Sequence, residues 1–263
     1  MFVVGTVMAI VIVRSPDNSK AQSSGLISGT IIPLYIYPTN PSWTTVTTVK
    51  DAHPKVPIVV IANPNSGPGS FPDGNFVNGI NRLRAHGIVV IGYVATGYGT
   101  RSLTFVENQI NKYRSWYNVN GILFDEMSNV AGHETYYRTL SNYAKSLGLS
   151  YTVGNPGTDV PATYVGTVDT ILIYENRGYP SLSYLDGWHS QYSRTNWGVT
   201  LYGDPSLYQP WIAYAKQYVG YIYITNDVLP NPYDALPPYF RTLVSGLDQN
   251  KGGTGIAQSR IQI

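Results

Sequence analysis

The clearest structural signal in the chain is the stretch Asn-Gly-Ile-Leu-Phe-Asp-Glu-Met at residues 120–127, where a short apolar run ends in two adjacent acids. Residues 122–124 have the length and composition of a strand that is buried on both faces, as in a parallel sheet. In α/β proteins the carboxyl ends of such strands carry the chemistry. The stretch therefore predicts a parallel sheet that presents Asp125 and Glu126 at its functional edge.

A second stretch has the same shape. Residues 170–175, Thr-Ile-Leu-Ile-Tyr-Glu, form another short β-branched run that ends in a carboxylate. A charge at the end of an apolar strand costs free energy unless it is paired or used in chemistry, so we take Asp125, Glu126 and Glu175 as candidate catalytic residues. Neighbouring residues on a strand point to opposite sides, and we expect only one of Asp125 and Glu126 to face the pocket while the other supports it or anchors a loop.

Working outward, the chain from Ile31 onward alternates short apolar strands with polar segments that suit helices, which is typical of βα units around a parallel sheet. The eight predicted strands are residues 31–37, 57–62, 88–94, 122–125, 150–153, 170–175, 198–202 and 219–225. Eight units without a break in composition predict a single closed (β/α)8 TIM barrel. An open doubly wound sheet is the competing architecture.

Composition excludes several classes of function. Only 12% of residues are charged and the formal net charge is +2, so there is no electrostatic footprint for nucleic acid or an anionic membrane. The chain has no cysteine, its four histidines are scattered, and no serine-hydrolase elbow, dinucleotide loop or P-loop is present. We therefore expect no metal and no cofactor. The 23 tyrosines and 5 tryptophans suit a neutral polyhydroxylated ligand, although core-edge packing is the simpler explanation for any single tyrosine.

The two ends of the chain differ from its centre. An apolar run at residues 2–13 is followed by a polar segment, so residues 1–24 have the pattern of a signal peptide or a short anchor. The run is shorter than the roughly 20 apolar residues that span a bilayer. We expect a monomeric protein that is secreted or held at the cell surface, with the barrel in residues 25–249 and a loosely packed Gly-rich tail in residues 250–263.

The predicted carboxyl ends of the strands also carry tyrosines and asparagines, with almost no basic residues. Amides and aromatic rings without cations are typical of a sugar-binding site. Asn63 and Asn155 each precede a proline, so each of them taken alone is also an ordinary turn residue. The candidate substrate contacts are Tyr35, Tyr37, Asn63, Tyr93, Tyr98, Asn155 and Tyr223.

Several blocks carry a resemblance to a known family. They are Val-Val-Ile-Ala-Asn-Pro-Asn-Ser-Gly-Pro-Gly (59–69), Gly-Tyr-Val-Ala-Thr-Gly-Tyr-Gly-Thr-Arg (92–101), Gly-Ile-Leu-Phe-Asp-Glu (121–126), Asn-Pro-Gly-Thr (155–158), Tyr-Glu (174–175) and Asn-Pro-Tyr-Asp (231–234). In these blocks the chain resembles the spherulin-4 family, which includes family 135 of the glycoside hydrolases. The resemblance implies a (β/α)8 hydrolase similar to endo-α-1,4-N-acetylgalactosaminidases acting on galactosamine-containing exopolysaccharide, with the family's acidic cluster at Asp125, Glu126 and Glu175.

The leading hypothesis is a secreted endo-acting glycosidase whose partner is a polysaccharide. Asp125 would be the nucleophile or charge stabiliser and Glu175 the general acid/base, while Glu126 would be a helper able to exchange roles with either. The two working carboxyl groups lie about 5 to 5.5 Å apart in retaining enzymes and roughly 6.5 to 9.5 Å apart in inverting ones. The alternative is a non-catalytic cell-surface lectin or matrix protein in which the acids are hydrogen-bonded scaffold. Deacetylation of an amino sugar is a weaker alternative, since it normally needs a metal held by His and Asp.

Overall fold

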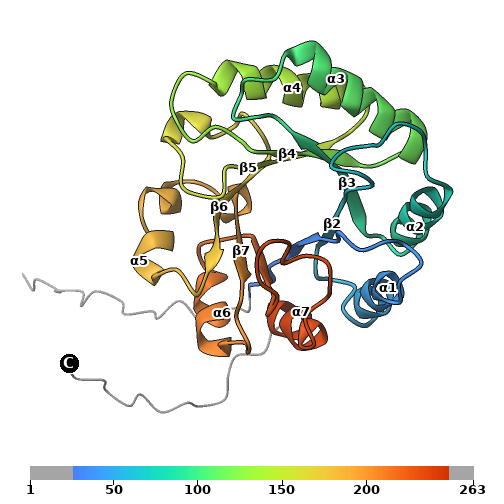
Figure 1. The fold of residues 1–263 in the computed structure, drawn as a ribbon. Coiled ribbons are helices and arrows are strands. Elements are labelled where there is room, and N and C mark those ends of the chain that lie inside the picture. Colours follow the sequence, from blue (N-terminus) through green and yellow to red (C-terminus); the bar gives the residue numbers. More distant parts are fainter. Residues whose placement is uncertain (1–25, 249–263) are drawn as a thin grey trace, which may run out of the picture.

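The computed structural model describes residues 26–248, and in them one parallel sheet is rolled into a barrel (Figure 1). The eight strands pair in chain order and are β1 (Thr30–Pro33), β2 (Ile58–Ala62), β3 (Val89–Ala95), β4 (Gly121–Asp125), β5 (Tyr151–Asn155), β6 (Thr170–Arg177), β7 (Trp197–Tyr202) and β8 (Tyr221–Ile224). The predicted (β/α)8 TIM barrel is confirmed. The expected signal or anchor segment at 1–24, the tail at 250–263 and the two outermost residues of the expected barrel, 25 and 249, lie outside the described residues.

The barrel closes through a short backbone contact before the first strand. Gly29 N donates to the carbonyl oxygen of Gly220 at 2.7 Å, and the carbonyl oxygen of Gly29 accepts from Ile222 N at 3.0 Å. A Cβ atom at Gly29 would lie 2.6 Å from the carbonyl oxygen of Pro57, so a side chain would not fit there. This bridge joins β8 back to the start of β1 and rules out the open doubly wound sheet.

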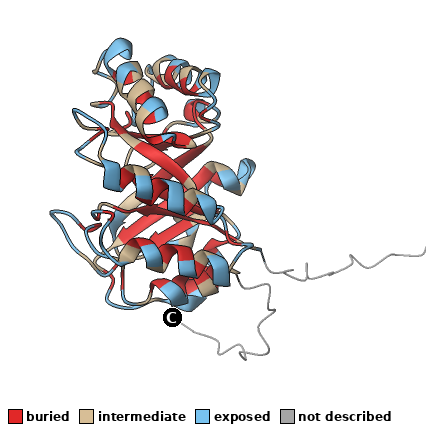
Figure 2. Ribbon diagram, turned by 90° about the vertical axis from the view of Figure 1, so that its right-hand side faces the viewer, coloured by how far each residue is buried: buried red, intermediate tan, exposed pale blue. Residues whose placement is uncertain are grey.

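Helices cover the outside of the barrel, as Figure 1 shows. They are α1 (Ser42–Ala52), α2 (Gly74–Ala85), α3 (Leu103–Lys112), α4 (Glu134–Ser146), α5 (Leu182–Leu185), α6 (Gln209–Ala215) and α7 (Phe240–Asp248). Short 3₁₀ turns lie at Ala162–Tyr164, Trp188–Gln191 and Arg194–Asn196. Figure 2 shows the helices turning exposed residues outward while the strands are buried. No helix within residues 26–248 combines the length and the apolarity needed to cross a bilayer.

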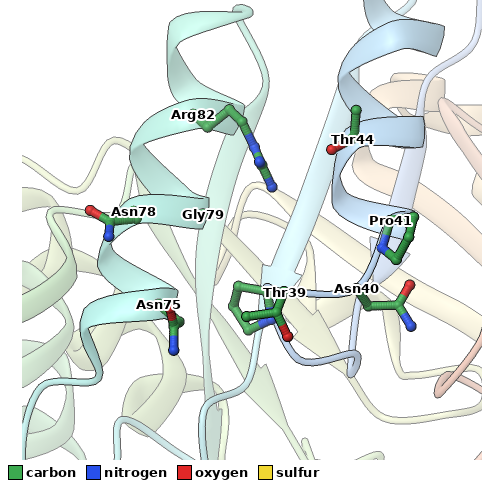
Figure 3. A pocket seen from close by; sticks show the side chains of 9 residues that line it. Thr39, Asn40, Pro41, Thr44, Asn75, Asn78, Gly79 and Arg82 are labelled. Atoms are coloured by element: carbon green, nitrogen blue, oxygen red, sulfur yellow. The ribbon is translucent and has the colours of Figure 1, made fainter.

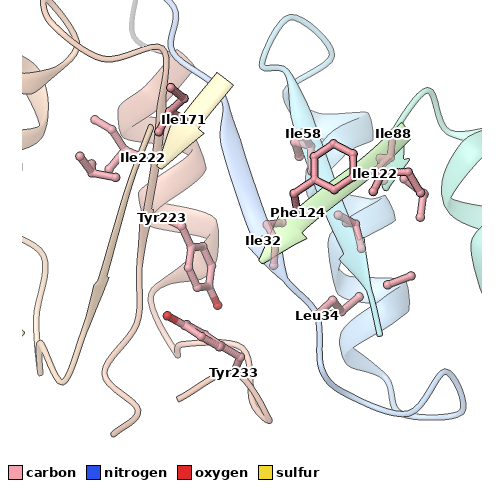
Figure 4. Close-up of a cluster of buried hydrophobic side chains, with 14 of the residues drawn as sticks. Ile32, Leu34, Ile58, Ile88, Ile122, Phe124, Ile171, Ile222, Tyr223 and Tyr233 are labelled. Atoms are coloured by element: carbon pink, nitrogen blue, oxygen red, sulfur yellow. The ribbon is translucent and has the colours of Figure 1, made fainter. Parts of the chain in front are cut away.

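The strands separate two apolar cores. The larger core lies between strands and helices, where residues such as Ile32, Ile58, Ile122 and Phe124 pack together (Figure 4). The smaller core fills the barrel interior and consists of Ile31, Val59, Ile61, Ile91, Leu123, Val153 and Leu172. In β1 to β4, alternate residues enter the two cores, which explains why these strands are apolar on both faces. The interior core closes the barrel from below and forms the base on which the site is built.

Helix boundaries follow local capping chemistry. The Ser102 side chain accepts a hydrogen bond from Phe105 N at the start of α3, as a capping serine does. This α-helix ends at Lys112 and continues as one π-helical turn, Tyr113–Tyr117. In that turn the Tyr113 hydroxyl donates to the carbonyl oxygen of Ala62 and the Tyr117 hydroxyl to that of Pro68. The wider turn therefore ties α3 to the carboxyl end of β2.

The first strand is shorter than predicted. It ends at Pro33, whereas the apolar pattern predicted a strand to residue 37. Beyond Pro33, Tyr35 N donates to the carbonyl oxygen of Tyr233 at 3.2 Å, in the loop between β8 and α7. The backbone thus leaves the sheet to bind a loop that is distant in the sequence, and hydrophobic patterning carries no signal for such a partner.

Candidate active site

Strand β4 carries Asp125 into the barrel by regular alternation. Leu123 faces the interior core, Phe124 the outer core, and Asp125 the barrel mouth. The hydroxyl of Tyr93, on β3, donates to Asp125 Oδ2 at 2.7 Å. Asp125 therefore points where the strand pattern predicted, and it is held there by a phenol on the neighbouring strand.

Glu126 takes a different direction. Its φ angle is 50°, in the left-handed region, and the chain turns sharply at this residue. Its Oε2 atom accepts a hydrogen bond from Gly97 N at 3.1 Å, and its carbonyl oxygen accepts from Tyr98 N at 2.7 Å. Glu126 thus anchors the loop after β3 and is not among the residues that line the pocket beside Asp125.

Strand β6 brings Glu175 to the mouth through a β-bulge. Its register with β7 passes from Leu172 paired with Gly198 directly to Tyr174 paired with Val199, so Ile173 is an extra residue. Ile173 and Tyr174 both pack against the outer core, whereas Leu172 faces the interior. Because two successive residues face outward, Glu175 returns to the inside of the barrel, and a regular strand would have turned it away.

Asn155, at the end of β5, connects the two acids. Its Nδ2 atom donates to Asp125 Oδ1 at 2.9 Å and to Glu175 Oε2 at 2.6 Å. The two bridged oxygens therefore lie at most about 5.5 Å apart, the sum of the two distances. Its Oδ1 atom accepts from Gly157 N at 3.0 Å, which fixes the orientation of the amide. A single side chain thus sets the spacing of a carboxylate pair.

Two tyrosines complete the hydrogen bonding of the pair. Tyr93 donates to Asp125, and Tyr233, from the loop between β8 and α7, donates to Glu175 Oε1. Burial and the adjacent carboxylate raise the pKa of both phenols, so both remain protonated donors at neutral pH. Each carboxylate therefore has one phenol of its own and a share of the Asn155 amide.

The electrostatics of Asp125 reflect its burial. Loss of water raises the pKa of this carboxyl, and the nearby negative charge of Glu175 adds to the rise. The hydrogen bonds from Tyr93 and Asn155 stabilise the charged form and offset part of the effect. Asp125 consequently takes up a proton at higher pH than an exposed aspartate does.

The acids open into a pocket of about 140 Å³ at the barrel mouth. It is lined by Pro33, Tyr35, Ile61, Asn63, Tyr93, Leu123, Asp125, Asn155, Leu172, Glu175, Thr200 and Tyr233. A second cavity of about 300 Å³ lies next to it and shares Tyr35, Glu175 and Tyr233 with it. Glu175 therefore borders both cavities, whereas Asp125 lines only the smaller one.

The other predicted contacts divide into two groups. Tyr35, Asn63, Tyr93 and Asn155 line the pocket. Tyr37 and Tyr98 do not line it, and they are 48% and 60% exposed. The Tyr37 hydroxyl donates to Asp73 Oδ2 at 3.0 Å and accepts from Asn75 Nδ2 at 2.8 Å, which directs this residue toward α2.

The prediction for Tyr223 needs a correction. Its side chain is only 1% exposed and it does not line the pocket. Its ring lies near that of Tyr233, with the centroids 6.4 Å apart (Figure 4). Tyr223 does lie on β8 as predicted, but Tyr233, from the loop between β8 and α7, lines the pocket in its place.

Sequence reasoning missed two polar residues of the pocket lining. Tyr233 lies in a loop after the last strand, and the only signal for it was the Asn-Pro-Tyr-Asp block of the family resemblance. Thr200 lies inside β7, where a threonine in an apolar strand suggests no more than β propensity. Neither residue has a sequence pattern that marks it as part of a site.

A separate hollow of about 490 Å³ lies between α1 and α2, where Arg82 and Thr44 face each other with Asn75 and Asn78 nearby (Figure 3). Among the described residues that line it, none carries a carboxylate, so it offers no acid/base pair. Likewise, residues 26–248 contain no group of three or more His, Asp or Glu side chains arranged to hold a metal ion.

Comparison with known proteins assigns the chain to a family. The family model described as Spherulation-specific family 4 matches residues 29–247. The chain belongs to this family. Spherulin-4 of Physarum polycephalum is 38% identical over 151 residues, which are 56% of this chain and 45% of that protein. This member of the Spherulation-specific family 4 therefore spans less than half the length of that relative.

A solved structure is similar over nearly the whole barrel. Aspergillus clavatus Sph3, solved in complex with GalNAc, matches with a TM-score of 0.77 and 26% identity, covering 86% of this chain and 99% of that one. The β-mannanase of Streptomyces thermolilacinus, solved with mannohexaose, matches with a TM-score of 0.50 at 9% identity over 86% of this chain and 89% of that one. The second likeness shows the shared barrel fold alone.

Proposed function

We propose that this protein is a secreted endo-acting glycoside hydrolase that cleaves an α-1,4-linked polysaccharide containing galactosamine and N-acetylgalactosamine. The observation that carries the proposal is the bridge from Asn155 to Asp125 and Glu175, which keeps two carboxylates within reach of one glycosidic bond. Membership in the Spherulation-specific family 4 and the similarity to Sph3, a GalNAc-bound protein, support the choice of sugar.

The two cavities support different catalytic roles for the two acids. Glu175 borders both, so a glycosidic bond between sugars in the two cavities would lie beside it, and we assign Glu175 as the general acid/base. Asp125 lines only the deep pocket, and we assign it as the nucleophile. Glu126 does not exchange roles with them in this mechanism, because its carboxylate binds Gly97 N.

The reaction then has two steps. Asp125 attacks the anomeric carbon, and Glu175 gives its proton to the departing glycosidic oxygen. Glu175 next takes a proton from water, and that water attacks the anomeric carbon and releases Asp125. The short separation of the bridged oxygens supports this double displacement and retention of configuration, since an inverting pair needs roughly 6.5 to 9.5 Å to hold a water. Tyr233 can accept as well as donate a hydrogen bond, so Glu175 can hold the proton it transfers.

Location and assembly form part of the same proposal. The apolar segment within residues 1–24 supports secretion or attachment at the cell surface, where a polymer of this kind would be met. We further propose that the protein acts as a monomer.

A second candidate is a non-catalytic polysaccharide-binding protein of the cell surface. It is favoured by the hydrogen bonding of the acids, because all four carboxylate oxygens of Asp125 and Glu175 accept a bond from within the chain. Under this alternative the acids shape the pocket and cleave nothing.

The deciding experiment incubates the full chain with partially N-acetylated α-1,4-galactosaminan and analyses the products by mass spectrometry. We expect oligosaccharides from the wild type and none from Asp125→Asn or Glu175→Gln. Binding in all three proteins without release would support the binding-protein alternative. Oligosaccharides from all three proteins would refute the assignment of these acids.

A further inference from the structure

One buried polar atom in the pocket has no hydrogen-bond partner among the described residues. Thr200 is only 2% exposed, and its Oγ1 atom makes no hydrogen bond there. Its Cα atom is the register partner of Glu175 across β6 and β7, and both residues line the pocket. A buried hydroxyl without a partner is unfavourable, and a hydrogen bond to a bound ligand would remove that penalty.

The two carboxylates and the amide that bridges them are already engaged. Asn155 donates to both carboxylates, and each carboxylate accepts from its own tyrosine. The hydroxyl of Tyr223, the register partner of Thr200 on β8, is buried outside the pocket lining and, like that of Thr200, has no hydrogen-bond partner among residues 26–248. The Thr200 hydroxyl is therefore a donor, next to Glu175 in the strand register, that no acceptor within residues 26–248 takes up. An acceptor on the substrate is the partner that this position can take.

The same pocket has apolar walls formed by Pro33, Ile61, Leu123 and Leu172. A sugar hydroxyl there could accept from Thr200, but its own hydrogen would face these walls without an acceptor, whereas a methyl group would be stabilised there. An acetamido group combines one carbonyl acceptor with one methyl group. It thus matches a free hydroxyl donor beside an apolar wall.

We propose that Thr200 determines specificity by donating its hydroxyl hydrogen to the carbonyl oxygen of the acetamido group on the sugar in the deep pocket. The acetamido methyl group then packs against Leu123 and Leu172. The inference rests on the proposed function, because it puts an amino sugar in the pocket that holds Asp125 and Glu175. It adds which side chain of the deep pocket would recognise the N-acetyl group.

The test measures binding, so that it does not depend on hydrolysis. Calorimetric titration of the full chain compares N-acetylgalactosamine with galactose, two neutral sugars that differ at this substituent. We expect Thr200→Val to weaken binding of N-acetylgalactosamine about 3- to 10-fold, the usual effect of one lost hydrogen bond, and to leave galactose binding unchanged. Thr200→Ser keeps the hydroxyl and should retain the wild-type preference.

The outcomes separate cleanly. The proposal is overturned if Thr200→Val weakens the binding of both sugars equally or changes neither. It is also overturned if the wild type binds neither sugar or shows no preference for N-acetylgalactosamine. Valine is nearly isosteric with threonine, and the substitution removes a hydroxyl that has no partner, so the melting temperature of Thr200→Val should not fall. A marked fall would show that the hydroxyl is structural. A wild type that prefers N-acetylgalactosamine but releases no oligosaccharides would contradict the proposed hydrolysis alone.

Discussion

Strands β4 and β6 each carry, at or near the carboxyl end, a carboxylate that lines the pocket, but they place it there by different backbone routes. β4 alternates regularly, so Leu123 and Asp125 share the inner face. β6 contains one extra residue, Ile173, and only this bulge turns Glu175 inward. The identity of a strand-end acid is thus readable from the sequence, whereas its direction depends on the register with the neighbouring strand.

The largest effect is expected from removal of either charge. Asp125→Asn and Glu175→Gln should each lower kcat by about 10²- to 10⁴-fold, because each removes a group that acts in the transition state. Glu126→Gln is the matched control, since this carboxylate binds Gly97 N outside the pocket and should leave kcat nearly unchanged. Turnover on a defined N-acetylated oligosaccharide measures all three. A loss in Glu126→Gln as large as in Asp125→Asn would contradict the assigned roles.

The two strands should respond differently to the deletion of one outward-facing residue. Phe124 and Ile173 are both buried and face outward, but deletion of Phe124 turns Asp125 over, whereas deletion of Ile173 leaves Leu172 and Glu175 on the same face. Each deletion also removes a buried apolar side chain, which costs about 2 to 5 kcal/mol of stability.

Activity per folded molecule distinguishes the two deletions. Without Phe124 we expect no turnover, and without Ile173 a loss of up to about 10²-fold from displacement of the acid. Assays below the melting temperature of each variant, with folding checked by circular dichroism, measure this. Equal activity of the two variants would show that the bulge does not set the direction of Glu175.

A smaller effect is expected in the dependence of kcat/KM on pH. Asp125 must be charged to attack, and burial raises its pKa, so activity should be lost as pH falls at a higher pH than for an exposed aspartate. Tyr93→Phe removes a hydrogen bond to the charged form and should move this acid limb to still higher pH. Tyr233→Phe is the control, because its hydroxyl bonds to Glu175. An acid limb that stays in place in Tyr93→Phe argues against Asp125 as the group that titrates.

The smallest effect concerns stability. The pKa of Asp125 is higher in the folded chain than in an unfolded one, so the folded state binds the extra proton and the free energy of unfolding falls as pH rises through that interval. At neutral pH the buried charge therefore destabilises the fold. Asp125→Asn should raise the melting temperature at pH 7 and change it less at pH 4, by differential scanning fluorimetry. An equal shift at both pH values would show that the charge is not the cause.

The barrel could be predicted because its signal is local. Each strand is a short apolar run bounded by turn residues, and each long helix has a cap or an apolar stripe, as at Ser102 before α3. The end of β1 could not be predicted, because the hydrogen bond from Tyr35 N goes to Tyr233, which is almost two hundred residues away in the chain. Apolar patterning reports which face is buried and not which backbone is the partner.

The sequence by itself determined the parallel barrel and the three acids at strand ends, because strand period, helix caps and a charge after an apolar run are properties of neighbouring residues. The tertiary structure decided which acids meet. The bulge at Ile173 turns Glu175 inward, the left-handed backbone at Glu126 takes that acid away, and Asn155 sets the spacing of the pair. It also decided that Tyr233 and not Tyr223 lies in the pocket. These outcomes depend on contacts between strands and loops far apart in the chain, and local sequence preferences do not encode them.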